Sequence, residues 1–344
     1  MKAEPLALFF TDLHLQEDNV DDVISVCIQM INYAKEYDLK EVYCLGDIFH
    51  SRKAQTQNLL DSFEEILDIF QQEGVKFITC VGNHDKTDYT STASFLNSFK
   101  YHPAFHLVKS YEWFFIGQDK DVVIFLLSFF ATNIYKEQAR KMLGEVTFLK
   151  DLHENKVKFI LGTHIGIDGF AMNNGIISNE GIEVSTFQDF DYVLVGHFHN
   201  KVEKDNIHYI GSALQHSFGE DNDKGAFLLV NTPQDLDYQY LPLEFPNRRT
   251  ISIDLNDPST FNFEIGDEIT RLLIKGTKEQ YLLFDKSKFE GKNVTIKLTQ
   301  DITLQSIEKG VIHFTPEEII EVFKQFCEEK EYDATEGLIY LKNL

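Results

Sequence analysis

The sequence of 344 residues contains no apolar run near the roughly 20 residues that a membrane-spanning helix requires. Its first apolar run, residues 6–10, lacks a charged lead-in and a small-residue cleavage site, so we interpret it as a strand rather than a targeting signal. The four cysteines are scattered and form no CxxC pair. This spacing argues against a disulfide framework or a zinc knuckle and favours a reducing compartment. We therefore expect a cytoplasmic protein without a membrane partner.

Positive charge is also scarce. The sequence has 32 Lys and Arg residues and 55 Asp and Glu residues, which gives a formal net charge of −23. A protein that binds phosphodiester backbones unaided usually has a basic surface. The chain also lacks a G-x-x-x-x-G-K-[ST] loop, so any use of ATP must come from another subunit. Arg52, Lys53 and Lys86 are candidates for local contact with a substrate, with solvated surface charge as the alternative for each.

What the sequence does contain is five short polar clusters, each following an apolar run. The runs cover residues 6–10, 42–45, 75–81, 157–161 and 192–195, and the clusters are Asp12-Leu13-His14, Gly46-Asp47, Gly82-Asn83-His84-Asp85, Gly162-Thr163-His164 and Gly196-His197-Phe198-His199. Branched and aromatic residues in the runs are typical of buried strands. Because the carboxyl ends of neighbouring parallel strands converge on one crevice, these distant clusters are expected to meet.

Between the first three runs, apolar residues recur at helical spacing over residues 23–34 and 59–70. Strands that alternate with helices predict an α/β fold with a parallel sheet covered by helices. Beyond residue 127 the predicted strands are shorter, at residues 207–210, 226–230 and 238–241. We expect them to form a second, more antiparallel sheet.

Prolines and the pair Arg248-Arg249 mark a predicted boundary between a domain of residues 1–241 and a smaller one of residues 242–344. The smaller domain is expected to contain strands at 250–255 and 293–298 and a helix from Pro316 to Glu329. The apolar face of that helix is expected to pack on its own domain, with docking of a partner as the alternative.

The clusters supply seven side chains that suit hard divalent cations, namely Asp12, His14, Asp47, Asn83, His164, His197 and His199. With Asp47 as a bridge, they divide into Asp12, His14 and His199 around one ion and Asn83, His164 and His197 around another. Two ions roughly 3.5–4 Å apart can hold a hydroxide and polarise a phosphoryl oxygen. Asp-x-His or Gly-Asp alone is a weak signal, whereas Gly-Asn-His-Asp and Gly-His-x-His rarely occur by chance.

The five clusters in this order resemble the calcineurin-like metallophosphoesterase superfamily, with a likeness that covers about residues 6–230. Residues 46–53 and residues 209–213 with 218–225 are similar to the SbcD-type nuclease subunits. Residues 168–181 resemble the loop between the fourth and fifth clusters in the phage proteins, so the likeness is particularly to the phage recombination endonuclease subunit. The resemblance implies a four-layer α/β/β/α sandwich with a small C-terminal α+β capping domain. It also implies a cytoplasmic setting in a bacterium, or in a host cell for a phage-encoded chain.

The resemblance further implies Mn²⁺ as the activating ion, with Mg²⁺ as the alternative. His84 would be the acid that protonates the leaving oxygen, Asp85 would orient His84, and His50 would lie near the substrate phosphate, although a histidine there can also simply cap a strand. Six other histidines fit no motif and are interpreted as structural or surface residues: His102, His106, His153, His208, His216 and His313.

The function implied is that of a DNA nuclease subunit with 3′–5′ exonuclease and single-strand endonuclease action in recombination and repair, working with an SMC-like, SbcC-type ATPase. A homodimer is left open. One alternative is a small-substrate phosphoesterase acting on nucleotides or cyclic nucleotides, because the same metal ligands serve many leaving groups. A second is a metal-free interaction scaffold, although scaffolds of this kind typically lose ligands and all seven are present here.

Overall fold

A computed structural model describes residues 3–117, 120–154, 156–171, 177, 181–266, 268–289 and 292–299. The helix predicted from Pro316 to Glu329 lies outside these described residues. Among the helices within them, none is both long enough and apolar enough to cross a membrane.

The first sheet has six strands in the order β12-β11-β1-β2-β3-β4. Its strands are β1 (Glu4–Phe10), β2 (Glu41–Cys44), β3 (Lys76–Cys80), β4 (Phe105–Val108), β11 (Gly225–Asn231) and β12 (Leu236–Pro242). The pairs from β1 to β4 are parallel. The alternation of strands and helices therefore predicted this part of the fold correctly.

The second sheet also has six strands, in the order β5-β6-β7-β8-β10-β9. They are β5 (Tyr111–Ile116), β6 (Val122–Leu127), β7 (Lys158–His164), β8 (Tyr192–Gly196), β9 (Val202–Lys204) and β10 (Ile207–Tyr209). The four central strands β6, β7, β8 and β10 pair in parallel, and only the edge strands β5 and β9 are antiparallel.

The prediction of a more antiparallel second sheet is therefore wrong. The strands predicted at 226–230 and 238–241 are β11 and β12, which extend the first sheet by pairing antiparallel to β1 and to each other. Strand β11 is buried on both faces, with Leu228 packed toward one layer of core and Phe227 toward another. Short apolar strands of this kind carry no local signal for the sheet that they join.

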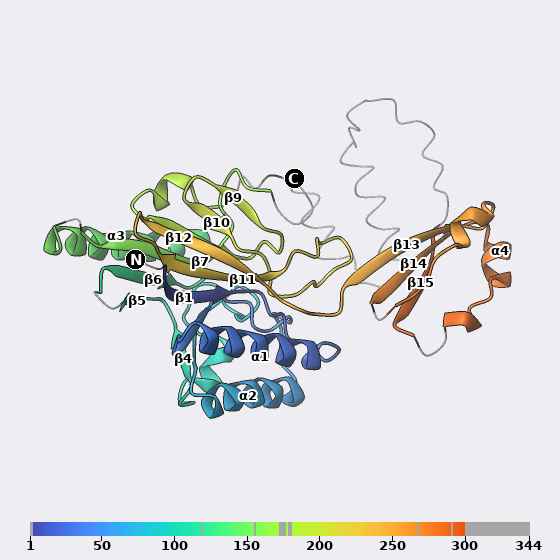
Figure 1. Cartoon of the computed structure of the whole chain (residues 1–344), viewed down its shortest axis with the longest axis horizontal. Coiled ribbons are helices and arrows are strands. Elements are labelled where there is room, and N and C mark those ends of the chain that lie inside the picture. Colours follow the sequence, from blue (N-terminus) through green and yellow to red (C-terminus); the bar gives the residue numbers. More distant parts are fainter. Residues whose placement is uncertain are drawn as a thin grey trace, which may run out of the picture.

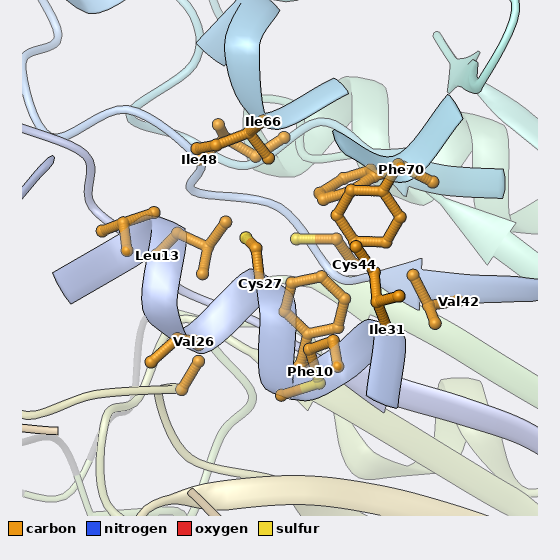
Figure 2. Close-up of a cluster of buried hydrophobic side chains, with 14 of the residues drawn as sticks. Phe10, Leu13, Val26, Cys27, Ile31, Val42, Cys44, Ile48, Ile66 and Phe70 are labelled. Atoms are coloured by element: carbon orange, nitrogen blue, oxygen red, sulfur yellow. The ribbon is translucent and has the colours of Figure 1, made fainter. Parts of the chain in front are cut away.

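Three layers of apolar side chains join the sheets and helices into a four-layer α/β/β/α sandwich. Helices α1 (Val20–Glu36) and α2 (Gln57–Gln72) cover the outer face of the first sheet, and α3 (Thr132–Leu152) covers that of the second. A third cluster fills the space between the sheets. Figure 2 shows Cys27 and Ile31 of α1 beside Phe10 of β1 and Cys44 of β2. The implied four-layer architecture is confirmed.

A separate three-stranded parallel sheet follows, in the order β13-β14-β15. Its strands are β13 (Arg248–Asp254), β14 (Ile269–Lys275) and β15 (Val294–Thr299), with the short helix α4 (Lys278–Leu283) between the last two. Thr277 and Gln280 form a capping box at the start of α4. Figure 1 shows this C-terminal sheet lying to one side of the two large sheets, reached through the chain between β12 and β13.

Candidate metal centre

All five polar clusters lie at the carboxyl ends of strands in the two large sheets. In the first sheet, Asp12 follows β1, Asp47 follows β2 and Asn83 follows β3. In the second, His164 ends β7 and His197 follows β8. Because these strands are parallel within each sheet, their ends share one edge, and the sandwich brings the two edges together.

The backbone at this edge adopts conformations that side chains rarely allow. Asp12, His14, Asp47 and His197 have φ angles of 55°, 45°, 53° and 90°. Non-glycine residues in this left-handed region are uncommon, cost free energy and concentrate at functional sites. Gly82 is required for a different reason, since a Cβ atom there would lie 2.1 Å from Asp47 Oδ1.

Asp12, His14 and His199 form what we call the first group. His14 Nε2 lies 3.1 Å from His199 Nε2 and 3.5 Å from Asp12 Oδ1. Asp12 Oδ1 is buried and has no hydrogen-bond partner among the described residues. A buried carboxylate oxygen left in this state is costly unless a cation or a donor satisfies it. The first group therefore fits a bound cation.

Asp47, Asn83, His164 and His197 form the second group. His164 Nε2 lies 3.3 Å from Asp47 Oδ2 and 3.0 Å from Asn83 Oδ1, and His197 Nδ1 lies 2.9 Å from the same amide oxygen. Asp47 Oδ2 is also 3.7 Å from His14 Nε2, so this carboxylate stands between the two groups. Ring nitrogens and oxygens of this kind are ligands for divalent ions.

The ring orientations and charges also suit a cation at the centre. His164 Nδ1 donates to the Leu45 carbonyl and His199 Nδ1 donates to Glu220 Oε1, which turns both Nε2 atoms toward the ligands. Burial alone lowers the pKa of His164, but the carboxylates of Asp47 and Asp12 outweigh it and raise this pKa to about 9. The cluster thus attracts positive charge.

His84, His50 and Arg52 lie beside the two groups. The ring centroid of His84 is 4.6 Å from that of His14 and 5.7 Å from that of His50. His84 Nδ1 donates to the His50 carbonyl, and the Arg52 guanidinium donates to His84 Nε2 at 2.7 Å. Burial lowers the pKa of His84 to about 4. The structure therefore brings these three predicted site residues together.

The predicted pairing of Asp85 with His84 is wrong. The Asp85 carboxylate is buried and accepts hydrogen bonds from four backbone N–H groups: those of Asp47, Ile48, Phe49 and Gly82, at 2.9–3.1 Å. It therefore holds the turn that carries Asp47 against the turn that carries Asn83. Burial is the main reason that the pKa of Asp85 is raised to about 6.

The prediction that Lys86 contacts the substrate is also wrong. Its side chain is 0% exposed, and its ammonium donates to the carbonyls of Ser91 and Phe129 and lies 3.5 Å from the centre of the Phe130 ring. Burial lowers its pKa to about 8. The enclosed lysine therefore links the backbone at Ser91 to the backbone at Phe129. Lys53 is exposed beside Arg52, and its contact with substrate stays a prediction.

Two residues of the site were missed by sequence reasoning. His216, interpreted as an ordinary histidine, donates through Nε2 to the Asp12 carbonyl at 2.6 Å, and its ring centroid lies 4.7 Å from that of His14. Glu220 accepts from His199, and its pKa is lowered to about 2 because hydrogen bonding and the charges of His199 and Lys224 outweigh burial. Glu220 lies in residues 218–225, which carry part of the family resemblance, whereas His216 matches no motif.

The chain belongs to the calcineurin-like phosphoesterase family, whose model matches residues 6–201 and so spans all five clusters. Membership makes the chain a hydrolase of phosphoesters that uses divalent metal ions. The two groups of candidate ligands described above are consistent with that chemistry.

Among proteins that the chain resembles, "Putative phosphoesterase 244L" of invertebrate iridescent virus 6 is 27% identical over 82% of this chain and 97% of its own length. "Exonuclease subunit 1" of Enterobacteria phage T4 is 26% identical over 59% of this chain and 56% of its own length. A subunit of the nuclease SbcCD from Staphylococcus epidermidis is 29% identical over 32% of this chain and 31% of its own length.

Proposed function

We propose that this hydrolase is a metal-dependent DNA nuclease subunit whose active site holds two divalent ions, with Mn²⁺ as the activating ion and Mg²⁺ as the alternative. The observation that carries the two-ion proposal is the position of Asp47, which lies within 3.7 Å of imidazoles from both groups. Asp12, His14 and His199 would hold one ion, and Asn83, His164 and His197 the other, with Asp47 as the bridge. Such ions polarise a phosphoryl oxygen and lower the pKa of a bound water.

His84 is proposed to protonate the leaving oxygen. Its backbone N–H donates to Asp47 Oδ1 at 2.8 Å and its Nδ1 is held by the His50 carbonyl, so the ring is fixed with Nε2 toward the site. Arg52 has only donors, so in the contact seen here His84 Nε2 accepts. A substrate phosphate would draw the guanidinium away, and its negative charge would favour the protonated imidazole. His50 and Lys53 are proposed to contact the same phosphate.

DNA as the substrate is supported by the nuclease names of two relatives and by the likeness of residues 46–53 to nuclease subunits. The activities proposed are 3′–5′ exonuclease and single-strand endonuclease. The net charge of −23 is unusual for a lone DNA-binding protein, and the sequence has no P-loop. We therefore propose that an SMC-like ATPase holds the duplex, and that residues 242–344 cap the site and dock that partner.

A second candidate is a phosphoesterase of small substrates such as nucleotides. The acidic composition favours it, and the relative with the longest match named above is called only a phosphoesterase. A metal-free scaffold is disfavoured because all seven proposed ligands lie at one site with an unsatisfied buried carboxylate oxygen at its centre.

The decisive assay compares labelled duplex DNA, single-stranded DNA and a panel of free nucleotides in the presence of Mn²⁺. The proposal expects cleavage of DNA to exceed hydrolysis of any free nucleotide. The same assay is repeated after a chelator removes the metal, which should abolish both activities. Faster hydrolysis of a free nucleotide than of DNA would replace the proposal with the second candidate.

A His84→Ala variant separates proton transfer from metal binding. Because His84 is proposed as an acid and not as a ligand, we expect turnover to fall by about 10²- to 10⁴-fold while Mn²⁺ binding measured by calorimetry is retained. His102→Ala is the matched control, since His102 pairs with Asp68 at 3.2 Å and has no proposed role. A His84→Ala variant that keeps most of its rate would show that another group donates the proton.

A further inference from the structure

The segment of residues 212–220, which we call the site loop, is hydrogen-bonded to the backbone at two places in or next to the first group, at His199 and at Thr11. The Ser212 N–H donates to the His199 carbonyl at 3.0 Å, and the Ala213 N–H donates to the Thr11 carbonyl at 2.9 Å. The loop therefore rests against the ends of two strands from different sheets, at the residues that precede or carry proposed ligands.

Two side chains of the site loop reach the first group directly. His216 Nε2 donates to the Asp12 carbonyl, which helps to hold Asp12 in its left-handed conformation. Glu220 accepts from His199 Nδ1 at 3.0 Å through one oxygen and from the His216 N–H at 3.1 Å through the other. His216 and Glu220 are thus linked to each other and each orients one proposed ligand. Partners of this kind orient metal ligands and tune their affinity.

A third residue of the loop, Gln215, is hydrogen-bonded to Arg248 of the C-terminal sheet. Its side chain is 3% exposed. Gln215 Oε1 accepts from the Arg248 N–H at 2.5 Å, and the Gln215 carbonyl accepts from Arg248 Nε at 3.1 Å. Gln215 Nε2 donates to the Glu220 carbonyl at 2.9 Å. One buried amide therefore connects the first residue of β13 to the backbone of Glu220.

The contact continues through Phe218, whose ring lies 4.6 Å from the guanidinium carbon of Arg271 on β14 and 5.8 Å from that of Arg248. One cleft of about 620 Å³ includes Phe218 and Arg248 in its lining, and another of about 490 Å³ includes Glu220 and Arg248. Arg248, which lines both clefts, is also the residue that is hydrogen-bonded to Gln215.

We propose that Gln215 is a positioning residue that couples the C-terminal sheet to the first group of metal ligands. A displacement of β13 pulls on Gln215, and through the Glu220 backbone it changes the orientation of His199 and the support of Asp12 by His216. A partner protein that moves the C-terminal sheet would thereby tune one ion and leave the other in place. This inference rests on the two-ion function proposed above.

The test measures Mn²⁺ binding to the full chain by calorimetry and by electron paramagnetic resonance. Wild type is expected to bind two ions and to show the spectrum of a magnetically coupled pair. In Gln215→Leu, the affinity for one ion is expected to fall about 10- to 100-fold and the coupled signal to weaken, while the other ion is retained. Arg249→Gln is the matched control, because Arg249 adjoins Arg248 but pairs with Glu268 on the surface of the sheet and is 51% exposed.

Gln215→Glu is a second, milder variant in case Gln215→Leu does not fold. It keeps the acceptor for the Arg248 N–H and loses the donor to the Glu220 carbonyl. It should give a smaller loss at the same ion, as should Arg248→Ala. The coupling is overturned if folded variants at these positions bind both ions as wild type does, or lose both ions equally. Wild type that binds fewer than two ions would instead refute the two-ion proposal.

Discussion

The two groups of proposed ligands are held by different parts of the fold. In the second group, His164 is the last residue of β7, is fully buried and is fixed by the Leu45 carbonyl, so the sheet itself sets its position. In the first group, the side chain of His199 is 17% exposed and depends on Glu220 of the site loop. The comparison teaches that both groups lie at strand ends, but that the first group has additional hydrogen bonds from the loop of residues 212–220.

Asp47→Ala should affect both groups of ligands equally. Because this carboxylate lies between them and accepts the backbone N–H of His84, its loss is expected to remove both ions and to reduce turnover to background. The measurement is metal content per chain after dialysis, together with the rate on DNA. A variant that keeps one ion at undisturbed high affinity would contradict the bridging role.

Glu220→Gln should weaken only the first group. The amide keeps the size of the side chain but removes the charge that orients His199, so we expect about 10- to 100-fold weaker binding of one Mn²⁺. The other ion should bind as in wild type, because none of the described contacts of Glu220 reaches the second group. Titration by calorimetry distinguishes the two events. Equal weakening of both ions would mean that the groups are not separable in this way.

The pH dependence of binding should reveal the charge of the second group. Since the pKa of His164 is raised to about 9, the proton that it carries near neutral pH must leave before Nε2 can bind an ion. We expect the affinity for Mn²⁺ to rise by up to about tenfold per pH unit from about pH 7 and to level off above about pH 9. Affinity that stays flat over this range would show that His164 is neutral before the ion binds.

The same raised pKa affects the metal-free protein. A histidine whose folded-state pKa exceeds its unfolded value contributes stability that is fully present below about pH 6.5 and is lost as the pH rises through about 9. The metal-free chain should therefore unfold at a lower temperature at pH 9 than at pH 7. Differential scanning calorimetry of the chelated protein checks this direction, and a His164→Asn variant should lack the change.

Sequence predicted the parts of this centre that are local. The seven candidate ligands directly follow or end apolar runs, and the apolar periodicity of residues 23–34 and 59–70 correctly indicated α1 and α2. The errors concern partners that meet only after folding. Lys86 packs against the Phe130 ring, and the Asp85 carboxylate accepts hydrogen bonds from the turn after β2. Residues adjacent in the sequence predict neither contact. For the same reason β11 and β12 were assigned to the wrong sheet.

The smallest expected effect compares two cations that sequence alone treated as equivalent. Arg52 is exposed and contacts His84, so Arg52→Ala should raise KM for DNA about fivefold, which corresponds to about 1 kcal/mol for an exposed charge contact. Lys86→Met should leave KM unchanged and instead lower the melting temperature, because the carbonyls of Ser91 and Phe129 lose their donor. Steady-state kinetics and thermal unfolding of both variants separate these outcomes. A higher KM in Lys86→Met at unchanged stability would indicate that Lys86 contacts the substrate after all.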